Sequence, residues 1–330
     1  MKAATYQRYG PPDVVNITEM EKPTPKDNEV LIRVHASTVT SGDWRARSLE
    51  MPAGFGFLGR LVFGLSKPRQ PILGTELAGV IEAVGKDVSK FKTGDEVFAF
   101  PGAKMGSHVE YKTMPENGPI ALKPANLTFE EAAALSFGGS TAVEIFKKGK
   151  IKPGDRVLVV GASGGVGTAA VQIAKHFGAH VTGVTSTANL ELARSIGANV
   201  VIDYTKEDFT KNGETWDIIV DTVGTAPFSR SEGSLKEGGR LLVVLGGLGD
   251  LLRAPLAAMR GSKRVIAGPV GEPPENLRLL AELAAAGEFT PVIDRRYPFA
   301  EIVDAHRHVD TGRKRGNVVI VMQSSERRAE

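Results

Sequence analysis

The chain has 330 residues, with 41 basic and 38 acidic side chains, a formal net charge of +3 and no cysteine. Because the basic and acidic side chains nearly balance, the protein has no long-range electric field of one sign, which argues against a nucleic-acid or polyanion binder. The absence of cysteine excludes disulfide frameworks, thiolate zinc sites, iron–sulfur clusters and cysteine nucleophiles, and the length is sufficient for two domains.

The first ten residues, MKAATYQRYG, contain no apolar run long enough for a secretory signal peptide. The most apolar stretch near the start, residues 51–65, is too short to span a bilayer and is interrupted by Arg60, so we expect a surface flap and no membrane partner. Together with the lack of cysteine, these features predict a cytoplasmic protein.

Residues 3–124 alternate short β-type runs, at 30–34, 79–84 and 96–100, with turns rich in proline, glycine and aspartate. This pattern predicts an all-β module with long connections.

Within this module, residues 51–65 carry four glycines, which predicts neither a stable helix nor a strand. The segment also holds large apolar side chains: Phe55, Phe57, Leu58, Leu61, Val62 and Phe63. One hypothesis is a mobile lid whose phenylalanines stack on a flat substrate. The alternative is a flap that only covers the β module or a neighbouring subunit.

After residue 124 the pattern changes to alternating strands and helices, beginning with a capping box formed by Thr128 and Glu131. Mostly apolar runs predict strands buried between helix layers. These runs are residues 156–160, 180–184, 199–202, 217–221, 240–245 and 263–267. Helical stretches fall between them at 166–177, 188–196 and 228–235. Together they predict a doubly wound parallel sheet, which binds nucleotides at its switch point.

A helix at 275–286 and a strand at 317–322 follow, and the tail at 324–330 is expected to fray. We expect the strand to join the N-terminal β module, so that the nucleotide domain is inserted in it. The expected divisions are 1–125 for the first part of that module, 126–268 for the nucleotide domain and 269–330 for the second part.

The strongest motif is VLVVGASGGVG at residues 157–167, an apolar strand that runs into a glycine-rich turn and a helix. A pyrophosphate site at a helix N-terminus requires this order. The match to GxGxxG is imperfect, since Ala162 stands at the first glycine, while Gly167 would let the helix pack on the sheet. The residues predicted to hold the dinucleotide are Ala162, Ser163, Gly164, Gly165 and Val166.

The second strand of this unit ends in Thr185-Ser186-Thr187, where NAD-binding proteins place a carboxylate for the ribose 2′-hydroxyl. No acid stands here to repel a 2′-phosphate, and the hydroxyls offer donors, so the sequence favours NADP over NAD. The alternative is a polar turn without preference, because it contains no lysine or arginine for a charge-assisted bond.

With these motifs the chain resembles the medium-chain dehydrogenase/reductase superfamily, and within it the zinc-independent, quinone oxidoreductase-like branch. The likeness covers almost the whole chain and rests on residues 74–85 (GTELAGVIEAVG), 91–97 (FKTGDEV), 161–167 and 312–320. It implies a GroES-like catalytic domain around a Rossmann NADP-binding domain, with the substrate between the two.

Zinc-dependent members carry a cysteine where this chain has Thr40 and a histidine where it has Thr75, and only Glu76 remains. A lone carboxylate does not make a zinc site, so we expect no metal and expect Glu76 to hold the loop near Gly74. The histidine pairs 176/180 and 306/308 are expected at the surface.

The resemblance implies further site residues. Thr40 is expected to present its hydroxyl to the nicotinamide, and Asp43 is either catalytic or a loop cap. The cofactor positions carried over are Thr141 under the nicotinamide ribose, Tyr204 near the 2′-phosphate, the backbone at Leu245 and Gly246, and Asn317 near the pyrophosphate. Alternatively, Tyr204 shields a strand end and Asn317 is a turn residue. Arg45 replaces a tyrosine of several quinone reductases, which leaves the proton donor open.

Hydride addition to a quinone or an α,β-unsaturated carbonyl spreads charge into a conjugated enolate, so it needs a Lewis acid less than ketone reduction does. We therefore expect an NADPH-dependent reductase of such acceptors. One alternative is an NADPH-binding structural or regulatory protein. The other is a nucleic-acid accessory role, for which only residues 313–315 are suitably basic. The strand at 263–267 is expected at a sheet edge, and relatives pair that edge in a homodimer.

Overall fold

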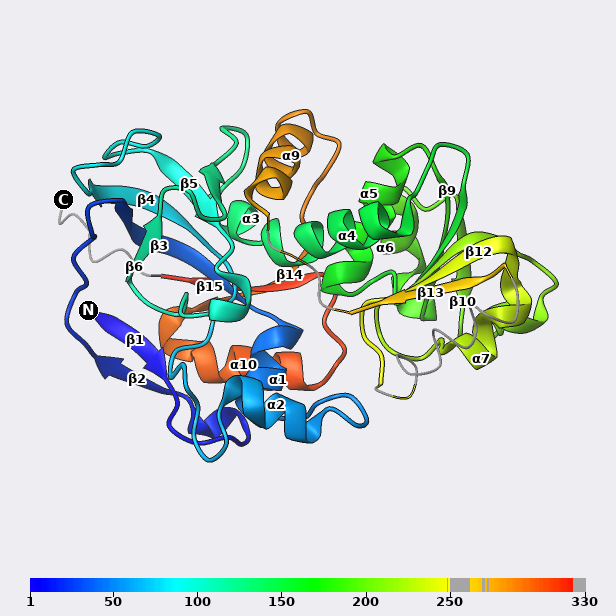
Figure 1. Cartoon of the computed structure of the whole chain (residues 1–330), viewed down its shortest axis with the longest axis horizontal. Coiled ribbons are helices and arrows are strands. Elements are labelled where there is room, and N and C mark those ends of the chain that lie inside the picture. Colours follow the sequence, from blue (N-terminus) through cyan, green and yellow to red (C-terminus); the bar gives the residue numbers. More distant parts are fainter. Residues whose placement is uncertain (248, 250–261, 269–270, 272, 323–330) are drawn as a thin grey trace.

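The computed structural model describes residues 1–247, 249, 262–268, 271 and 273–322. Two large β-sheets organise this part of the chain, and they lie toward opposite ends of the molecule's long axis (Figure 1). The predicted fraying of residues 324–330 lies outside the described residues.

One sheet has six parallel strands, and the chain adds them on both sides of β8. In spatial order they are β10 (Val200–Asp203), β9 (His180–Thr185), β8 (Arg156–Val160), β11 (Trp216–Asp221), β12 (Leu235–Val243) and β13 (Arg264–Ala267). The order reverses between β8 and β11, and doubly wound sheets bind ligands at such a point. The predicted parallel sheet is confirmed, and β13 forms one edge of it.

Both faces of this sheet are covered, because alternate residues of β8 enter two different cores. Val157 and Val159 pack in one cluster with residues of the helices, while Leu158 and Val160 pack in another with Trp216. The helices of this part are α3 (Phe129–Ala133), α4 (Ser136–Gly149), α5 (Gly165–His176), α6 (Leu190–Ser195), α7 (Phe228–Ser231) and α9 (Pro274–Ala285).

The helix predicted at 228–235 is shorter than expected. α7 ends at Ser231, a 3₁₀ turn follows, and Leu235 is already extended with its side chain in the core. Because the Leu235 side chain is buried in the core, β12 begins at Leu235 and not at residue 240 as predicted. Other 3₁₀ turns are Pro12–Val14, Gly102–Lys104, Thr187–Asn189, Phe209–Lys211 and Phe299–Glu301.

The second large sheet combines both ends of the chain. Its strands are β14 (Ile293–Pro298), β15 (Asn317–Val321), β3 (Glu29–Val39), β4 (Leu77–Val84), β5 (Glu96–Ala99) and β7 (Ile120–Leu122), with β6 (Tyr111–Pro115) paired to β3. β1 (Lys2–Thr5) and β2 (Asn16–Glu19) form a separate ribbon, and α10 (Ile302–Asp310) precedes β15. β15 pairs antiparallel with β3, so the C-terminal strand joins the N-terminal module as predicted.

The prediction that residues 3–124 are all β is wrong, because α1 (Ser41–Ser48) and α2 (Gly56–Phe63) interrupt the strands. α1 begins with a capping box. The Asp43 backbone N–H donates to Thr40 Oγ1 over 3.3 Å, and the Asp43 carboxylate accepts from the Thr40 N–H over 2.7 Å. Two unpaired donors at the start of α1 are thereby satisfied.

The glycines of residues 51–65 do not prevent a helix, contrary to the prediction. Gly59 packs directly on Met51, whose Cγ lies 2.6 Å from the place a Cβ would take, so a side chain would push the helix off. Gly64 has φ +128° and ends α2. These two glycines fit α2 against the protein and terminate it.

Candidate active site

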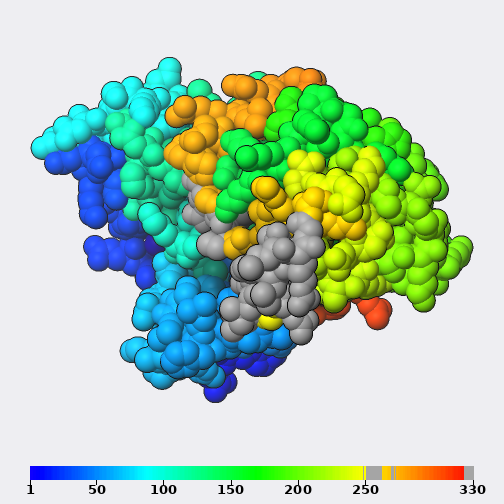
Figure 2. Space-filling view, turned by 45° about the vertical axis from the view of Figure 1, so that its right-hand side comes forward, coloured from blue at the N-terminus to red at the C-terminus, as the bar shows by residue number. Residues whose placement is uncertain are grey.

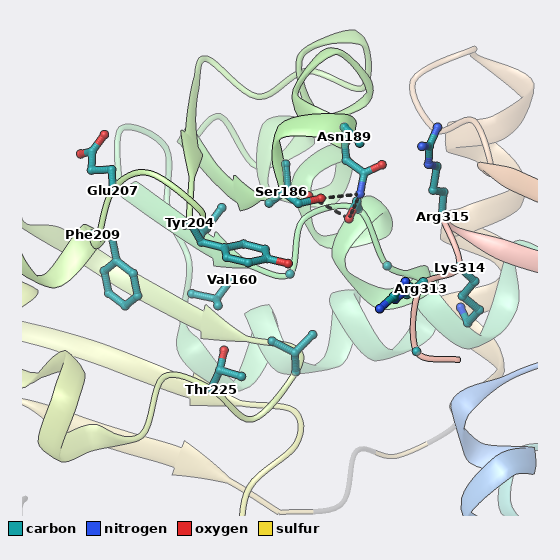
Figure 3. Close-up of a pocket in the computed structure, with 18 of the residues that line it drawn as sticks. Val160, Ser186, Asn189, Tyr204, Glu207, Phe209, Thr225, Arg313, Lys314 and Arg315 are labelled. Carbon is teal, nitrogen blue, oxygen red and sulfur yellow. Dashed lines mark hydrogen bonds between the residues drawn. The ribbon is translucent and has the colours of Figure 1, made fainter. Parts of the chain in front are cut away.

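A cavity of about 930 Å³ opens at the carboxyl ends of β8, β9 and β11. Its wall consists of the glycine turn after β8, the turn after β9, the segment after β10 and residues 312–315 before β15 (Figure 3). This position is the switch point of the sheet.

The glycine turn is shaped so that α5 approaches it closely. Gly161 has φ +84°, and a Cβ on Gly167 would lie 1.9 Å from the Gly161 carbonyl oxygen, so only glycine fits at 167. Ala162 is fully buried, and its methyl group lies 3.1 Å from the place where Gly183 would carry a Cβ. Gly183 therefore makes room for the alanine that stands at the first glycine of the motif.

The start of α5 fits a pyrophosphate. Gly164 caps the helix and lines the cavity, and a Cβ there would meet only the Gly161 oxygen, at 3.6 Å. The first turn of a helix leaves backbone N–H groups without helical partners, and its dipole favours an anion. Ser163 lines the cavity beside Gly164, while Gly165 and Val166 lie in the first turn of α5.

Hydroxyl and amide groups connect the turns after β8 and β9. The Thr185 hydroxyl donates to Ser163 Oγ over 2.9 Å, and Asn189 Nδ2 lies 3.2 Å from both Ser163 Oγ and Ser186 Oγ. Thr185 is only 2% exposed and its hydroxyl already donates to Ser163, so this hydroxyl is not free to bind a ligand. Ser186 presents its hydroxyl to the cavity, while Asn189, which the sequence did not predict, connects the two turns through its Nδ2.

Basic side chains reach this cavity from a distant part of the chain. Arg313, Lys314 and Arg315 line it opposite Tyr204 (Figure 3). The turn after β9 itself has no lysine or arginine. From the sequence alone, residues 313–315 are predicted only as a basic segment suited to nucleic acid. Sequence order gave no signal that the two segments meet.

Lys314 lies beside the start of α5. Its Nζ donates to the Gly316 oxygen over 2.5 Å and lies 3.0 Å from the position a Cβ of Gly165 would take. Burial lowers the pKa of Lys314 to about 8, and the charge of Glu76 opposes this shift. Even so, the ammonium is largely charged at neutral pH.

Tyr204 directly follows β10, and its backbone N–H donates to the Thr185 oxygen over 3.0 Å. Its side chain is 63% exposed, and the phenol points into the cavity toward Arg313 and Lys314 (Figure 3). The acids Glu207 and Asp208 also line the cavity, and Asp208 pairs with Arg230 over 3.1 Å.

Thr40, the N-cap of α1, and Asp43, in its first turn, are both buried. The Thr40 hydroxyl donates to Asp43 Oδ2 over 2.7 Å and lies 3.4 Å from Thr75 Oγ1. Asp43 Oδ1 accepts from the Gly74 N–H over 2.7 Å. Asp43 therefore caps α1 and holds the Gly74 loop, while a catalytic role for either residue stays a prediction.

Glu76 stands in the loop between Gly74 and β4, and its side chain anchors that loop, as expected. Its buried carboxylate accepts from the Thr38 hydroxyl and the Phe137 N–H, and so joins β3 to the start of α4. Burial raises the pKa of Glu76 to about 7, although both hydrogen bonds lower it. Among the described residues, no group of three or more histidine, aspartate or glutamate side chains is arranged to hold a metal ion.

The prediction that His306 lies at the surface is wrong. His306 is 0% exposed because the inner face of α10, with Ile302 and Val309, packs into the core. Its ring contacts that of His108 with centroids 5.7 Å apart. His308 bonds to Asp294 over 2.6 Å.

The other carried-over residues lie outside the cavity wall. Thr141 is in α4 and donates to the Phe137 oxygen over 2.6 Å. Asn317 Nδ2 donates to the Val292 oxygen over 3.1 Å, and its Oδ1 lies 3.3 Å from a Cβ position on Gly165, at the start of α5. Leu245 and Gly246 follow β12, with the Leu245 oxygen 3.1 Å from a Cβ position on Gly224. Their cofactor roles stay predictions.

Comparison with known proteins places these features in a family. The family described as alcohol dehydrogenase GroES-like domain matches residues 26–125, and the family described as zinc-binding dehydrogenase matches residues 196–320. The chain is 36% identical to the 2-methylene-furan-3-one reductase of Solanum lycopersicum, over 97% of this chain and 79% of that protein. It is 32% identical to the chloroplastic NADPH-dependent alkenal/one oxidoreductase of Arabidopsis thaliana, with the same coverage.

A solved structure also resembles this chain over almost its whole length. The quinone oxidoreductase from Coxiella burnetii superposes with a TM-score of 0.85 and 28% identity, covering 98% of this chain and 99% of that one.

Proposed function

Since the chain belongs to the medium-chain dehydrogenase/reductase superfamily, in its quinone oxidoreductase-like branch, we propose that it transfers a hydride from NADPH to a quinone or an α,β-unsaturated carbonyl. The observation that carries this proposal is the cavity at the switch point, with a helix start on one side and hydroxyl and basic groups on the other. The named relatives reduce a methylene-furanone, alkenals or alkenones, and quinones, all conjugated acceptors.

The residues present fit a nicotinamide dinucleotide. Gly164 and the first turn of α5 would hold the pyrophosphate, and Lys314 beside them would add a positive charge. Ser186 and Asn189 would bind the adenosine ribose. When bound, the cofactor supplies the hydride, and the protein orients it and excludes water.

The preference for NADP is part of the proposal. Ser186 offers a hydroxyl donor where a carboxylate would repel the 2′-phosphate, and the exposed side chains of Arg313 and Arg315 line the same cavity. Asp203, at the end of β10, accepts from the hydroxyls of Thr187 and Thr205, so its charge is already partnered. Of the two acids in the cavity wall, Asp208 pairs with Arg230.

Zinc independence is a further part of it. Two positions that carry zinc ligands in the metal-dependent relatives are Thr40 and Thr75 here, and the Glu76 carboxylate is occupied by two donors. We propose that the Thr40 hydroxyl faces the nicotinamide end and that solvent supplies the proton to the enolate. Zinc measured by elemental analysis of the active protein tests this part, and one zinc per chain would overturn it.

A screen of NADPH oxidation against quinones, enones, enals and simple ketones tests the function. We expect turnover with the conjugated acceptors and little with simple ketones, because hydride addition to an isolated carbonyl leaves a localised alkoxide. Tight NADPH binding without turnover on the whole panel would instead favour a structural or regulatory protein.

We also propose that the protein is a homodimer. β13 is an edge of the six-stranded sheet, with Val265 and Ile266 half-buried in it, and an apolar edge strand invites pairing with a second copy.

A further inference from the structure

The outer side of α2 exposes a group of large apolar side chains to solvent. Their exposed fractions are 72% for Phe57, 58% for Val62, 58% for Leu65, 48% for Leu58 and 40% for Leu61. Their spacing places them on one side of the helix and its C-terminal turn, which we call the α2 apolar face. α2 lies at the lower edge of the molecule (Figures 1 and 2).

This exposure is not the result of a loose helix. On the inner side, Gly59 packs on Met51 and Phe63 packs against the core of the β module. The Tyr9 hydroxyl donates to the Gly64 oxygen over 2.8 Å and holds the end of the helix. The protein therefore presents the α2 apolar face on a fixed support, and contiguous apolar surface of this kind marks an interaction site.

The segment that carries this face has charges of one sign. Residues 51–75 contain no aspartate or glutamate but include Arg60, Lys67 and Arg69, all exposed. None of the three forms an ion pair with a carboxylate in the described part of the chain. Arg60 Nη1 donates to the Leu65 oxygen over 2.9 Å, so its guanidinium lies at the C-terminal turn of the face. The occupant of the face should therefore be apolar where it meets the helix and negative around it.

A second copy of this chain fits poorly. In a two-fold dimer with this face on its axis, the three basic residues of one copy would lie against those of the other. An anionic lipid surface satisfies both requirements, because phenylalanine and leucine enter the acyl boundary while arginine and lysine contact the headgroups. No helix among the described residues is long and apolar enough to cross a bilayer, so contact of this kind is peripheral.

We propose that the α2 apolar face docks this protein on anionic lipid surfaces, with Phe57, Leu58 and Val62 inserted at the acyl boundary and Arg60, Lys67 and Arg69 at the headgroups. Docking is independent of the catalytic chemistry, so it can be tested without turnover.

Co-sedimentation of the full chain with vesicles tests the proposal. Vesicles of phosphatidylcholine with phosphatidylserine should retain the protein, vesicles of phosphatidylcholine alone should retain much less, and added salt should release it. The double variant Leu58→Ser/Val62→Ser should lose at least tenfold in vesicle affinity. The double variant Lys67→Glu/Arg69→Glu should lose more than fivefold, since each surface charge contributes about fivefold.

Matched controls carry the same changes on other exposed positions. Leu122→Ser/Val200→Ser removes apolar side chains that are 56% and 47% exposed on β7 and β10, and Lys211→Glu reverses a charge far from α2. Both controls should bind vesicles like the parent. Circular dichroism and NADPH affinity should be unchanged in all variants.

Four results would overturn the proposal. The first is a parent protein that ignores anionic vesicles, and the second is equal vesicle binding by the α2 variants and the controls. The third is self-association of the parent that Leu58→Ser/Val62→Ser abolishes, which would assign the face to a second copy. An increased Michaelis constant for a bulky quinone in Phe57→Ser, without any change in vesicle binding, would assign α2 to a substrate lid instead.

Discussion

The hydroxyl of Thr185 donates a hydrogen bond to Ser163 Oγ over 2.9 Å and so joins the end of β9 to the glycine turn after β8. Both residues line the cavity, but Thr185 is only 2% exposed. Thr185 therefore shapes the site, and the Ser186 hydroxyl is left in this turn to meet a ribose phosphate, together with Arg313 and Arg315 across the cavity.

Replacing Ser186 by aspartate should reverse the cofactor preference. A carboxylate at this half-buried position would repel a 2′-phosphate and accept from a ribose 2′-hydroxyl, so we expect NADPH affinity to fall about 10- to 100-fold while NADH affinity holds or rises. Fluorescence titration with both cofactors measures this. Ser195→Asp, on an exposed serine at the end of α6, should leave both affinities unchanged. Equal effects of Ser186→Asp on NADPH and NADH would show that this turn does not discriminate.

Arg313→Gln and Arg315→Gln should each weaken NADPH about three- to tenfold and leave NADH nearly unaffected. Charge-assisted bonds to phosphate are strong, but both arginines are exposed and partly screened by salt. NADPH affinity should also depend less on salt in the variants than in the parent. Lys211→Gln serves as the control. Variants that bind both cofactors like the parent would remove these arginines from the site.

His306 should make the protein less stable in acid. Burial, and then the nearby charges of His108 and Arg47, keep the pKa of His306 well below its usual value, so the folded protein holds this ring neutral. The unfolded chain binds a proton below about pH 6.5, so the free energy of unfolding falls as the pH drops from there, by up to about 1.4 kcal/mol per pH unit.

Urea unfolding of the parent and His306→Leu at several pH values between about 7.5 and about 5 measures this effect. The variant should show the shallower pH dependence. His180→Gln, on an exposed histidine, should follow the parent. Identical slopes for the parent and His306→Leu would contradict the burial of a neutral ring.

The dimer prediction depends on β13. Light scattering at micromolar concentration should give twice the chain mass, and Val265→Lys should give monomers, because a lysine on an edge strand opposes pairing. Val200→Lys at the opposite edge, on β10, is the matched control and should stay dimeric. A monomeric parent would refute the dimer.

The sequence predicted what depends on local patterns. The parallel sheet and the position of its glycine turn could be predicted from the apolar run of β8 and the glycines that follow it. A buried strand requires apolar residues, and a positive φ favours glycine, so both features are visible in the sequence. The capping box at Thr128 was recognised for the same reason, and the structure confirms it.

What was missed depends on contacts between distant segments. Arg313 and Arg315 reach the cavity because the Gly316 N–H donates to the Ser163 oxygen over 2.8 Å and holds their segment against the glycine turn. His306 is a polar residue, but it lies on the buried inner face of α10. Gly59 is expected to break a helix, but here it lets α2 pack closely against Met51. Polarity and propensity are overridden by packing in these cases.

The central claim is hydride transfer from NADPH to a conjugated acceptor, and isotope transfer tests it most directly. The enzyme is incubated with an enone and with NADPH that carries deuterium at C4 of the nicotinamide, once for each face of the ring, and the product is analysed by mass spectrometry and NMR. We predict deuterium on the β-carbon of the saturated ketone from one of the two labelled cofactors. Deuterium on the carbonyl carbon, as in an allylic alcohol, or no transfer from either cofactor to any enone or quinone, would contradict the account.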